Sequence, residues 1–284
     1  MPLARIAPPL FVLIWATGFV VARLVAPHTE PFTFLFVRYV LAGSVLALVA
    51  WAAGAAWPAT ARDWRNGLIA GILLHGFYLG GVFWAVKHGL PAGISALVAG
   101  LQPVTTGLLA GPLLKEDVSP RRWFGIGLGF VGTALVVLPK LGSGVPLVPL
   151  VVAMLSMLSI TLGTIWQKRT AGRFDLRTNA VVQYVGAALV TLPLVLLFED
   201  GRIDPTPSLW IGLLWAVFGL SIGAIGLLLT LIRQGAVVGV ATLLYLVPPV
   251  AAVMAYLGFG ETLTVVQILG MAVAAVGVAA ASRS

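Results

Sequence analysis

Long apolar segments and short polar segments alternate along the whole chain. The apolar runs are about 20 residues long, and the brief stretches between them carry most of the charged residues. About 20 apolar residues in a helix span the hydrocarbon core of a bilayer, whereas a membrane strand shows about 10 residues of alternating polarity. The runs are continuous, so the pattern predicts ten transmembrane helices, at about 4–24, 33–53, 67–86, 92–113, 122–139, 147–167, 177–198, 209–231, 237–258 and 263–281.

The composition agrees with an all-α membrane protein. Hydrophobic residues make up 60% of the chain and charged residues only 9%, whereas soluble domains carry roughly 25% charged residues. The chain has no Cys, which excludes a disulfide framework and a thiolate metal site. His28 and His88 fall in connections and form no ligand cluster, so we expect neither a metal nor a cofactor.

The positive charges predict the orientation of the helices. The net charge is +8, but Lys and Arg lie in short connections, where they encode topology, so we expect no nucleic-acid partner. With a cytoplasmic N-terminus, the inner side holds twelve of them: Arg5, Arg62, Arg65, Lys115, Arg121, Arg122, Lys168, Arg169, Arg173, Arg177, Arg233 and Arg283. The outer side holds five: Arg23, Arg38, Lys87, Lys140 and Arg202. This bias predicts an inner-membrane protein with both termini in the cytoplasm.

The first apolar run resembles a signal peptide, but we interpret it as a retained span. The one plausible small-residue cleavage point follows Ala26. Pro27 comes directly after it and disfavours cleavage.

The two halves of the chain are similar to one another. At a spacing of about 145 residues, Val37-Arg38-Tyr39-Val40 aligns with Val182-Gln183-Tyr184-Val185, and Pro103 meets Pro249 with one residue of slippage. Five spans are an odd number, so two such halves enter the membrane in opposite orientations. The sequence therefore predicts inverted repeats over 1–143 and 144–284, a device of transporters whose halves rock about a midplane site. Duplication without transport is the alternative.

Four short motifs follow one another along the chain: Ile14-Trp15-Ala16-Thr17-Gly18-Phe19 in the first span, the Pro31 to Arg38 stretch of the second, and the ends of the fourth and ninth, Leu114-Lys115-Glu116 and Phe259-Gly260-Glu261. In the order of these motifs the chain resembles the drug/metabolite transporter superfamily, in its ten-helix EamA branch. Within the branch the chain is most similar to YddG-type exporters of aromatic amino acids. The resemblance implies export through a central cavity formed by helices 1–4 and 6–9, with helices 5 and 10 peripheral.

One departure concerns energy coupling. Related four-helix exporters carry a membrane-embedded Glu in their first helix that couples transport to protons. No Asp or Glu lies in the middle of any predicted span here. His75 is the ionisable group well inside a span, and burial favours its neutral form. We therefore expect facilitated movement down the substrate's own gradient.

The fourth and the ninth predicted spans carry one group of candidate binding residues. In the fourth span Ser95, Gln102 and Thr106 share one helix face and would line a cavity or bond to a neighbouring helix, and Pro103 frees a backbone carbonyl beside them. In the ninth, Tyr245 lies on the corresponding face with Thr242, and Pro248 and Pro249 predict a bend. These three prolines are candidate hinges, and static kinks are the alternative.

Further candidates lie in the first, third and seventh spans. His75 and Tyr78 are placed at i and i+3, and an ionisable residue within a span is a functional candidate by default. The alternative for His75 is a structural bond to a carbonyl. Trp15 and Tyr184 lie near mid-span and would offer a stacking surface for an aromatic or cationic ligand, or fill the core.

Three charged residues and several small ones have structural alternatives. Arg38 would pair with Glu30, bond to a helix-end carbonyl or bind a substrate carboxylate, and Glu116 and Glu261 would cap helices or pair with loops. The rows Gly125/Gly129/Gly132 and Gly270/Ala274/Gly277 are predicted packing faces. The stripe Ser156/Ser159/Gly163 is also a predicted packing face, and a cavity wall is its alternative.

The predicted function is the export of small amphipathic metabolites, most of all aromatic or other hydrophobic amino acids, by alternating access. A multidrug exporter, a sugar-phosphate carrier and a lipid scramblase-like protein are the alternatives. A sugar-phosphate carrier would need a cation deep in the cavity, and an intramembrane enzyme would need a catalytic pair, so we predict that the chain is not an enzyme. The partners are a small-molecule substrate and the lipid bilayer; a monomer is one option for the oligomeric state.

Overall fold

The computed structural model describes residues 2–90, 92–115, 117–138, 145–170, 175–234, 237–259 and 263–282. Within these ranges the regular structure is helical, and strand-like pairing is confined to a bridge between Thr29 and Ile203. The first part of the chain forms α1 (Pro2–Val25), α2 (Pro31–Ala52), α3 (Ala61–Gly71), η1 (Ile72–Phe77), α4 (Tyr78–Lys87), α5 (Ala92–Ala99), α6 (Gln102–Leu114) and α7 (Pro120–Val137). The second forms α8 (Leu147–Thr170), α9 (Leu176–Phe198), α10 (Pro207–Trp215), η3 (Ala216–Ala224), α11 (Ile225–Gln234), α12 (Val237–Thr242), η4 (Leu243–Leu246), α13 (Val247–Phe259) and α14 (Val265–Ser282).

Two long helices change their winding in the middle. Residues 61–87 and residues 207–234 are each continuous helices, and each contains a π-helical segment, η1 and η3 respectively. The two segments lie about 145 residues apart, the spacing of the sequence repeat. A π turn places an extra residue in the helix and redirects the side chains that follow it, and such turns are frequent at functional sites.

Two spans that were predicted as single helices are interrupted in the structure. The predicted span 92–113 is divided between α5 and α6, with Gly100 and Leu101 in a turn. The predicted span 237–258 passes from α12 through the tighter 3₁₀ turn η4 into α13. Pro103 follows the first break and Pro248 the second, and a proline removes a backbone donor and clashes with the preceding turn. The α-helical winding is thus interrupted beside these prolines.

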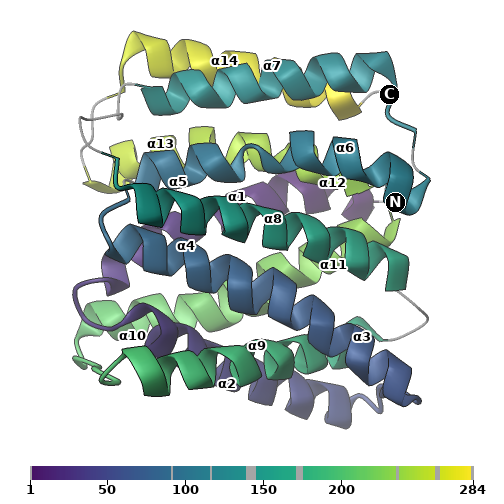
Figure 1. The fold of residues 1–284 in the computed structure, drawn as a ribbon, viewed down its shortest axis with the longest axis vertical. Helices are drawn as coiled ribbons and strands as arrows, with labels where there is room; N and C mark the ends of the chain where they lie inside the picture. The colour runs from purple at the N-terminus through teal and green to yellow at the C-terminus, as the bar shows by residue number, and fades with distance from the viewer. Residues whose placement is uncertain are drawn as a thin grey trace.

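The helices lie side by side in layers, as Figure 1 shows. α7 and α14 form an outer layer, and α1 begins at the same edge of the bundle where α14 ends. The backbones of α7 and α14 are in close contact. A Cβ built on Gly125 would lie 2.5 Å from the Ala281 nitrogen, and one on Gly270 would lie 2.7 Å from the Gly132 carbonyl oxygen. The two glycine rows are thus packing faces, as the sequence predicted.

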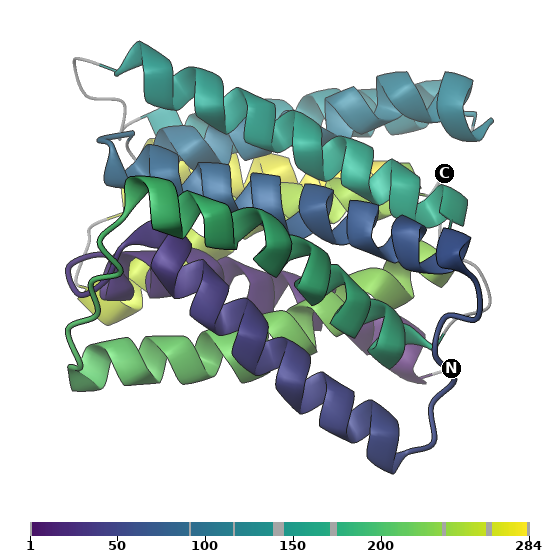
Figure 2. The same ribbon diagram turned by 60° about the horizontal axis from the view of Figure 1, so that its bottom comes forward.

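At the opposite side of the bundle α2 and α9 run next to one another (Figures 1 and 2). They bring Tyr39 and Tyr184 face to face, and both rings are completely enclosed. α3 also packs tightly on α9: a Cβ on Gly186 would lie 2.5 Å from the Leu68 carbonyl oxygen. The small-residue stripe of α8 is likewise a packing face, since the Ser159 hydroxyl donates to the Leu73 carbonyl (2.9 Å).

The outer surface of the bundle is apolar. Five helices are long and apolar enough to cross a membrane, namely 31–52, 61–87, 147–170, 176–198 and 207–234, and shorter apolar helices cover 6–22, 240–254 and 265–281. At the end of α9, Leu196, Leu197 and Phe198 are 74, 73 and 72% exposed. Contiguous exposed apolar surface of this kind is compatible with lipid and not with water. The chain is a multi-pass membrane protein.

Candidate functional site

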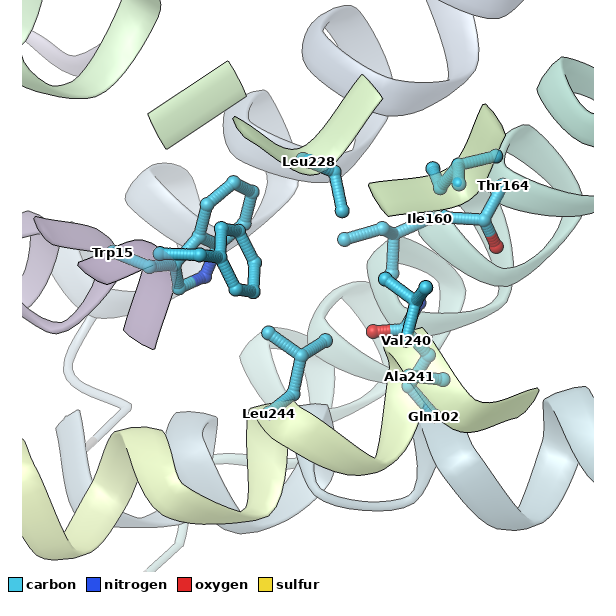
Figure 3. Close-up of a pocket in the computed structure, with 10 residues that line it drawn as sticks. Trp15, Gln102, Ile160, Thr164, Leu228, Val240, Ala241 and Leu244 are labelled. Atoms are coloured by element: carbon cyan, nitrogen blue, oxygen red, sulfur yellow. The ribbon is translucent and has the colours of Figure 1, made fainter. Parts of the chain in front are cut away.

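A narrow cavity lies between α1, α6, α8, α11 and the broken helix α12–η4 (Figure 3). Its lining is mostly aromatic and aliphatic, and consists of Phe11, Trp15, Gln102, Ile160, Thr164, Leu228, Ile232, Val240, Ala241 and Leu244. In this conformation it has room for about one water molecule. A cavity of this composition suits an apolar ligand with few polar groups, and it must widen before such a ligand fits.

Gln102 supplies the free polar group of this cavity. The residue is 2% exposed and lines the cavity, and its side-chain amide makes no hydrogen bond to another described residue. The hydroxyl of Thr164, which also lines the cavity, already donates to the Thr161 carbonyl (2.8 Å). A buried amide without a partner is costly, so Gln102 is poised to bond to a ligand or to water in the cavity.

Trp15 forms the aromatic wall opposite Gln102 (Figure 3). Its ring packs against Phe11, with centroids 5.2 Å apart, and lies nearly parallel to the ring of Tyr78 at 6.5 Å. Tyr78 itself is buried behind Trp15 and does not line the cavity. Trp15 and Gln102 are thus the two predicted binding residues that meet at the cavity.

The other predicted binding residues lie elsewhere, so their role in binding stays a prediction. Ser95 and Thr106 are buried, and their hydroxyls have no partner among the described residues. The break between α5 and α6 interrupts the helix face that they were predicted to share with Gln102. The ring of Tyr245 lies against Gly129 of α7, in a cluster with Ala110, and its hydroxyl also has no described partner.

His75 and Tyr184 belong to a polar network in the core between α2, η1, α9 and η3. The Tyr39 hydroxyl donates to the His75 carbonyl (2.9 Å), and the Tyr184 hydroxyl donates to the Ser221 carbonyl. The accepting carbonyls belong to the two π-helical segments, where helix winding is irregular. Each tyrosine hydroxyl therefore donates to a backbone carbonyl in the π-helical segment of its own half: Tyr39 to η1 and Tyr184 to η3.

A second set of bonds in this network crosses between the halves. Arg38 Nε donates to the Ser221 hydroxyl (2.8 Å). Gln183, which aligns with Arg38 in the repeat, bonds to His75 Nε2 through its side-chain oxygen (3.3 Å). Within the second half, the Gln183 nitrogen also donates to the side-chain oxygen of Gln167 (3.0 Å). An oxygen accepts from His75 Nε2, so that nitrogen carries the proton and Nδ1 is a buried lone pair without a described partner.

Arg38 therefore corrects one interpretation. The sequence suggested a pair with Glu30 or with a helix-end carbonyl, but Arg38 bonds to the side chain of Ser221. Glu30 instead accepts from the backbone nitrogens of Asp200 (3.0 Å) and Arg202 (3.3 Å) in the connection after α9. Glu116 and Glu261, which were predicted to cap helices or pair with loops, lie outside the described residues.

Sequence reasoning missed several residues of the cavity and network. Gln183 and Ser221 were given no role, although a buried amide in the middle of an apolar span is itself a signal. Gln183 also stands opposite Arg38 in the repeat, a position that already held a candidate. The aliphatic lining residues Ile160, Leu228 and Val240 gave no signal, because nothing distinguishes them in sequence from lipid-facing residues.

Comparison with known proteins identifies the class. The model of the EamA-like transporter family matches residues 9–138 and again residues 147–283. The two matches cover most of the chain, which belongs to the EamA-like transporter family, within the drug/metabolite transporter superfamily. The protein is thus a membrane transporter.

Individual relatives are distant but cover nearly the full length. The chain is 23% identical to an uncharacterized transporter, YvbV, of Bacillus subtilis, over 92% of this chain and 85% of the relative. It is 26% identical to a probable amino-acid metabolite efflux pump of Salmonella typhimurium, over 92% and 88% respectively. A crystal structure covering 98% of this chain and 96% of its own superposes with a TM-score of 0.82 at 20% identity, which shows a shared fold.

Proposed function

We propose that this protein exports small amphipathic metabolites, most of all aromatic and other hydrophobic amino acids, across the inner membrane by alternating access. The observation that carries the proposal is the cavity between Trp15 and Gln102. Its walls are aromatic and aliphatic, and its free polar group is one neutral amide. Such a lining favours a Phe-, Trp- or Met-like side chain over a sugar phosphate. A 26% identical relative is named a probable amino-acid metabolite efflux pump, which supports this substrate class.

The proposed architecture is ten spans in two inverted five-helix repeats, 1–143 and 144–284, with both termini in the cytoplasm. The π segments η1 and η3 and the two broken spans occur at corresponding positions of the halves, which supports the repeat. Interrupted helices at matching positions are the usual sign of a transporter's binding site. We further propose that the chain is similar in function to the YddG-type exporters.

The tightness of the cavity supports the proposed alternating access. Room for about one water molecule cannot hold an amino acid, so the lining helices must move apart to admit one. The breaks beside Pro103 and beside Pro248 and Pro249 are the proposed hinges, since the ordinary helical bonds are already interrupted there. The moving parts would be the third, fourth, eighth and ninth spans.

The test is flux through the purified protein in liposomes. We expect uptake of labelled Phe, Trp and Met, and Gln102→Ala should lower that uptake several-fold while the protein stays folded. The matched control is Gln267→Ala, which removes an equally buried amide that bonds to the Val136 carbonyl (3.2 Å) in α7 and should reduce stability rather than substrate preference. Equal losses of folded yield and flux in Gln102→Ala would instead make Gln102 a packing residue.

The same liposomes separate the alternatives. Transport of sugar phosphates without amino acids would contradict the proposed substrate class. Broad uptake of unrelated organic cations would favour a multidrug exporter. Movement of labelled phospholipid between leaflets without any solute flux would favour a lipid scramblase-like protein.

A further inference from the structure

Arg38 is a buried cation with unused hydrogen-bond donors. It is the eighth residue of α2 and is only 4% exposed. Its Nε donates to the Ser221 hydroxyl at 2.8 Å, and its two terminal nitrogens have no partner among the described residues. A guanidinium carries five N–H donors in a rigid fork, so four of the five are left over.

Among the described residues, no carboxylate pairs with Arg38 to balance this charge. The structure describes seven of the nine Asp and Glu residues, and all seven lie at helix ends or in connections. The carboxylates at the near end of α2 are already engaged: Glu199 accepts from the backbone nitrogens of Phe32 and Thr33, and Glu30 accepts from two backbone nitrogens after α9. An uncompensated charge in a membrane interior is unfavourable, so binding of an anion at Arg38 is favoured.

The second half of the chain carries a neutral residue, Gln183, at the position equivalent to Arg38. Gln183 aligns with Arg38, and it bonds across to His75 as Arg38 bonds across to Ser221. The Gln183 nitrogen is also occupied, by Gln167. A neutral amide therefore suffices to hold the network at this position. The network therefore does not require the positive charge of Arg38 or its free N–H donors.

The surroundings hold the guanidinium in place. Ser221, which accepts from Arg38, also accepts the Tyr184 hydroxyl at its carbonyl, and the Tyr184 ring is stacked on Tyr39 with centroids 5.9 Å apart. Tyr39 belongs to the same contiguous buried cluster as the cavity-lining residues Phe11 and Leu228. The guanidinium is therefore held in position, and Tyr39, the next residue in the chain, belongs to the core that also lines the cavity.

We propose that Arg38 binds the carboxylate of the transported substrate through its two terminal nitrogens. Planar, bidentate pairing is the geometry in which a guanidinium recognises a carboxylate. A single fixed charge suits a monoanion, whereas a phosphate dianion would bring a second negative charge that no described side chain balances. The identity of the substrate as an amino acid rests on the function proposed above, but anion binding at Arg38 is a separate property and can fail separately.

The experiment is competition in liposomes that contain the full-length protein. Unlabelled L-phenylalanine and L-phenylalaninamide, in which a neutral amide replaces the carboxylate, compete against labelled L-phenylalanine. For the wild type we expect phenylalanine to compete roughly tenfold to hundredfold better, the range for loss of a charge-assisted pair. Arg38→Gln should bring the two competitors to within about threefold of each other.

Arg38→Gln copies the residue found at the equivalent position, Gln183, so we expect it to fold. The matched control is Arg177→Gln, which removes an arginine that pairs with Asp175 at the start of α9 and should keep the wild-type preference. A wild-type preference in folded Arg38→Gln overturns the proposal. If that variant does not fold, thermal stabilisation of the wild type decides: 3-phenylpropanoate should raise the unfolding temperature and phenethylamine should not, and equal shifts overturn the proposal.

Failure of the proposed function gives a different result. If the wild type moves no amino acid, the substrate class is wrong. The carboxylate site then still stands if 3-phenylpropanoate stabilises the wild type and leaves Arg38→Gln unchanged, and it falls if both proteins respond alike.

Discussion

Tyr39 and Tyr184 stack face to face at the crossing of α2 and α9, with ring centroids 5.9 Å apart and planes 14° from parallel. Their hydroxyls donate to the carbonyls of His75 and Ser221, one in each π-helical segment. The pair therefore links the two helices to the two places where helix winding is irregular. Each hydroxyl donates to a carbonyl that the π turn has moved out of the regular helical hydrogen-bond pattern.

This arrangement predicts similar effects for two substitutions. Tyr39→Phe and Tyr184→Phe should each lower stability by about 1–3 kcal/mol, because each leaves a buried carbonyl without its donor. Tyr245→Phe is the matched control: its buried hydroxyl has no partner among the described residues, so its removal should be neutral or stabilising. Thermal unfolding in detergent measures all three. Equal losses in the three variants would assign the effect to ring packing and not to the hydroxyl bonds.

The α7–α14 contact predicts a difference between two glycines. A Cβ on Gly277 would lie 2.7 Å from the Gly129 Cα, so Gly277→Ala should cost about 1–3 kcal/mol by forcing the two helices apart. A Cβ on Gly127, in α7 itself, meets nothing within 4 Å, so Gly127→Ala should be neutral or slightly stabilising. Unfolding temperatures and folded yield report the difference. Transport by the surviving folded Gly277→Ala protein should keep the wild-type substrate preference.

Hydrogen bonds in both directions join the start of α2 to the end of α9, a contact that we call the clasp: Glu30 accepts from the connection after α9, and Glu199 accepts from the start of α2. Glu199 accepts from the Phe32 nitrogen (2.8 Å), the Thr33 nitrogen (2.7 Å) and the Thr33 hydroxyl (2.8 Å), where α2 begins. Glu199→Ala removes all three bonds and a negative charge beside a helix N-terminus, so we expect a loss of roughly 2 kcal/mol. Asp200→Ala, at an exposed neighbour, should have little effect. Thermal unfolding tests this, and similar values for the two variants would contradict the clasp.

The start of α9 predicts a dependence of stability on pH. Asp175 caps this helix by accepting from the Arg177 backbone nitrogen (2.8 Å), and its carboxylate pairs with the Arg177 guanidinium (2.7 Å). Hydrogen bonds from the Arg177 side chain lower the pKa of Asp175 to about 2. The carboxylate is thus more acidic when folded, so its stabilisation is complete above about pH 4 and is lost as the pH falls toward 2.

Asp175→Ala should therefore cost about 1 kcal/mol near neutral pH, the usual value of an N-cap, and almost nothing near pH 2. Unfolding of both proteins at a series of pH values measures the difference. A cost that stays constant down to pH 2 would show that the charge of Asp175 is not involved. Asp117→Ala, in an exposed connection, should show no effect at either pH.

Energy coupling gives the last prediction. The described carboxylates all lie at helix ends or in connections, and His75 is held by Gln183 in the network rather than in the cavity. We therefore expect facilitated flux of a labelled aromatic amino acid, without accumulation under an imposed pH gradient. His75→Gln should keep most of the downhill flux. Uphill accumulation that follows the pH gradient and disappears in His75→Gln would reverse this and make His75 the coupling residue.

The class of the protein and the course of its helices could be predicted from the sequence alone. Run lengths of about 20 apolar residues follow from the thickness of the bilayer, and helices occupy every predicted range. The glycine rows of α7 and α14 were also predictable, because only small residues let two backbones approach this closely. Trp15 and Gln102 could be singled out because an aromatic ring or an amide in mid-span is rare enough to be noticed.

The tertiary structure alone decided how the polar side chains are paired. Arg38 reaches Ser221, 183 residues away, and His75 reaches Gln183, 108 residues away, so these bonds depend on which helix faces meet. The π segments shift the side chains that follow them, and no pattern of apolar residues records that shift. In an apolar chain the hydrophobic pattern determines which segments enter the membrane, but packing between helices determines which few polar groups are left for a ligand.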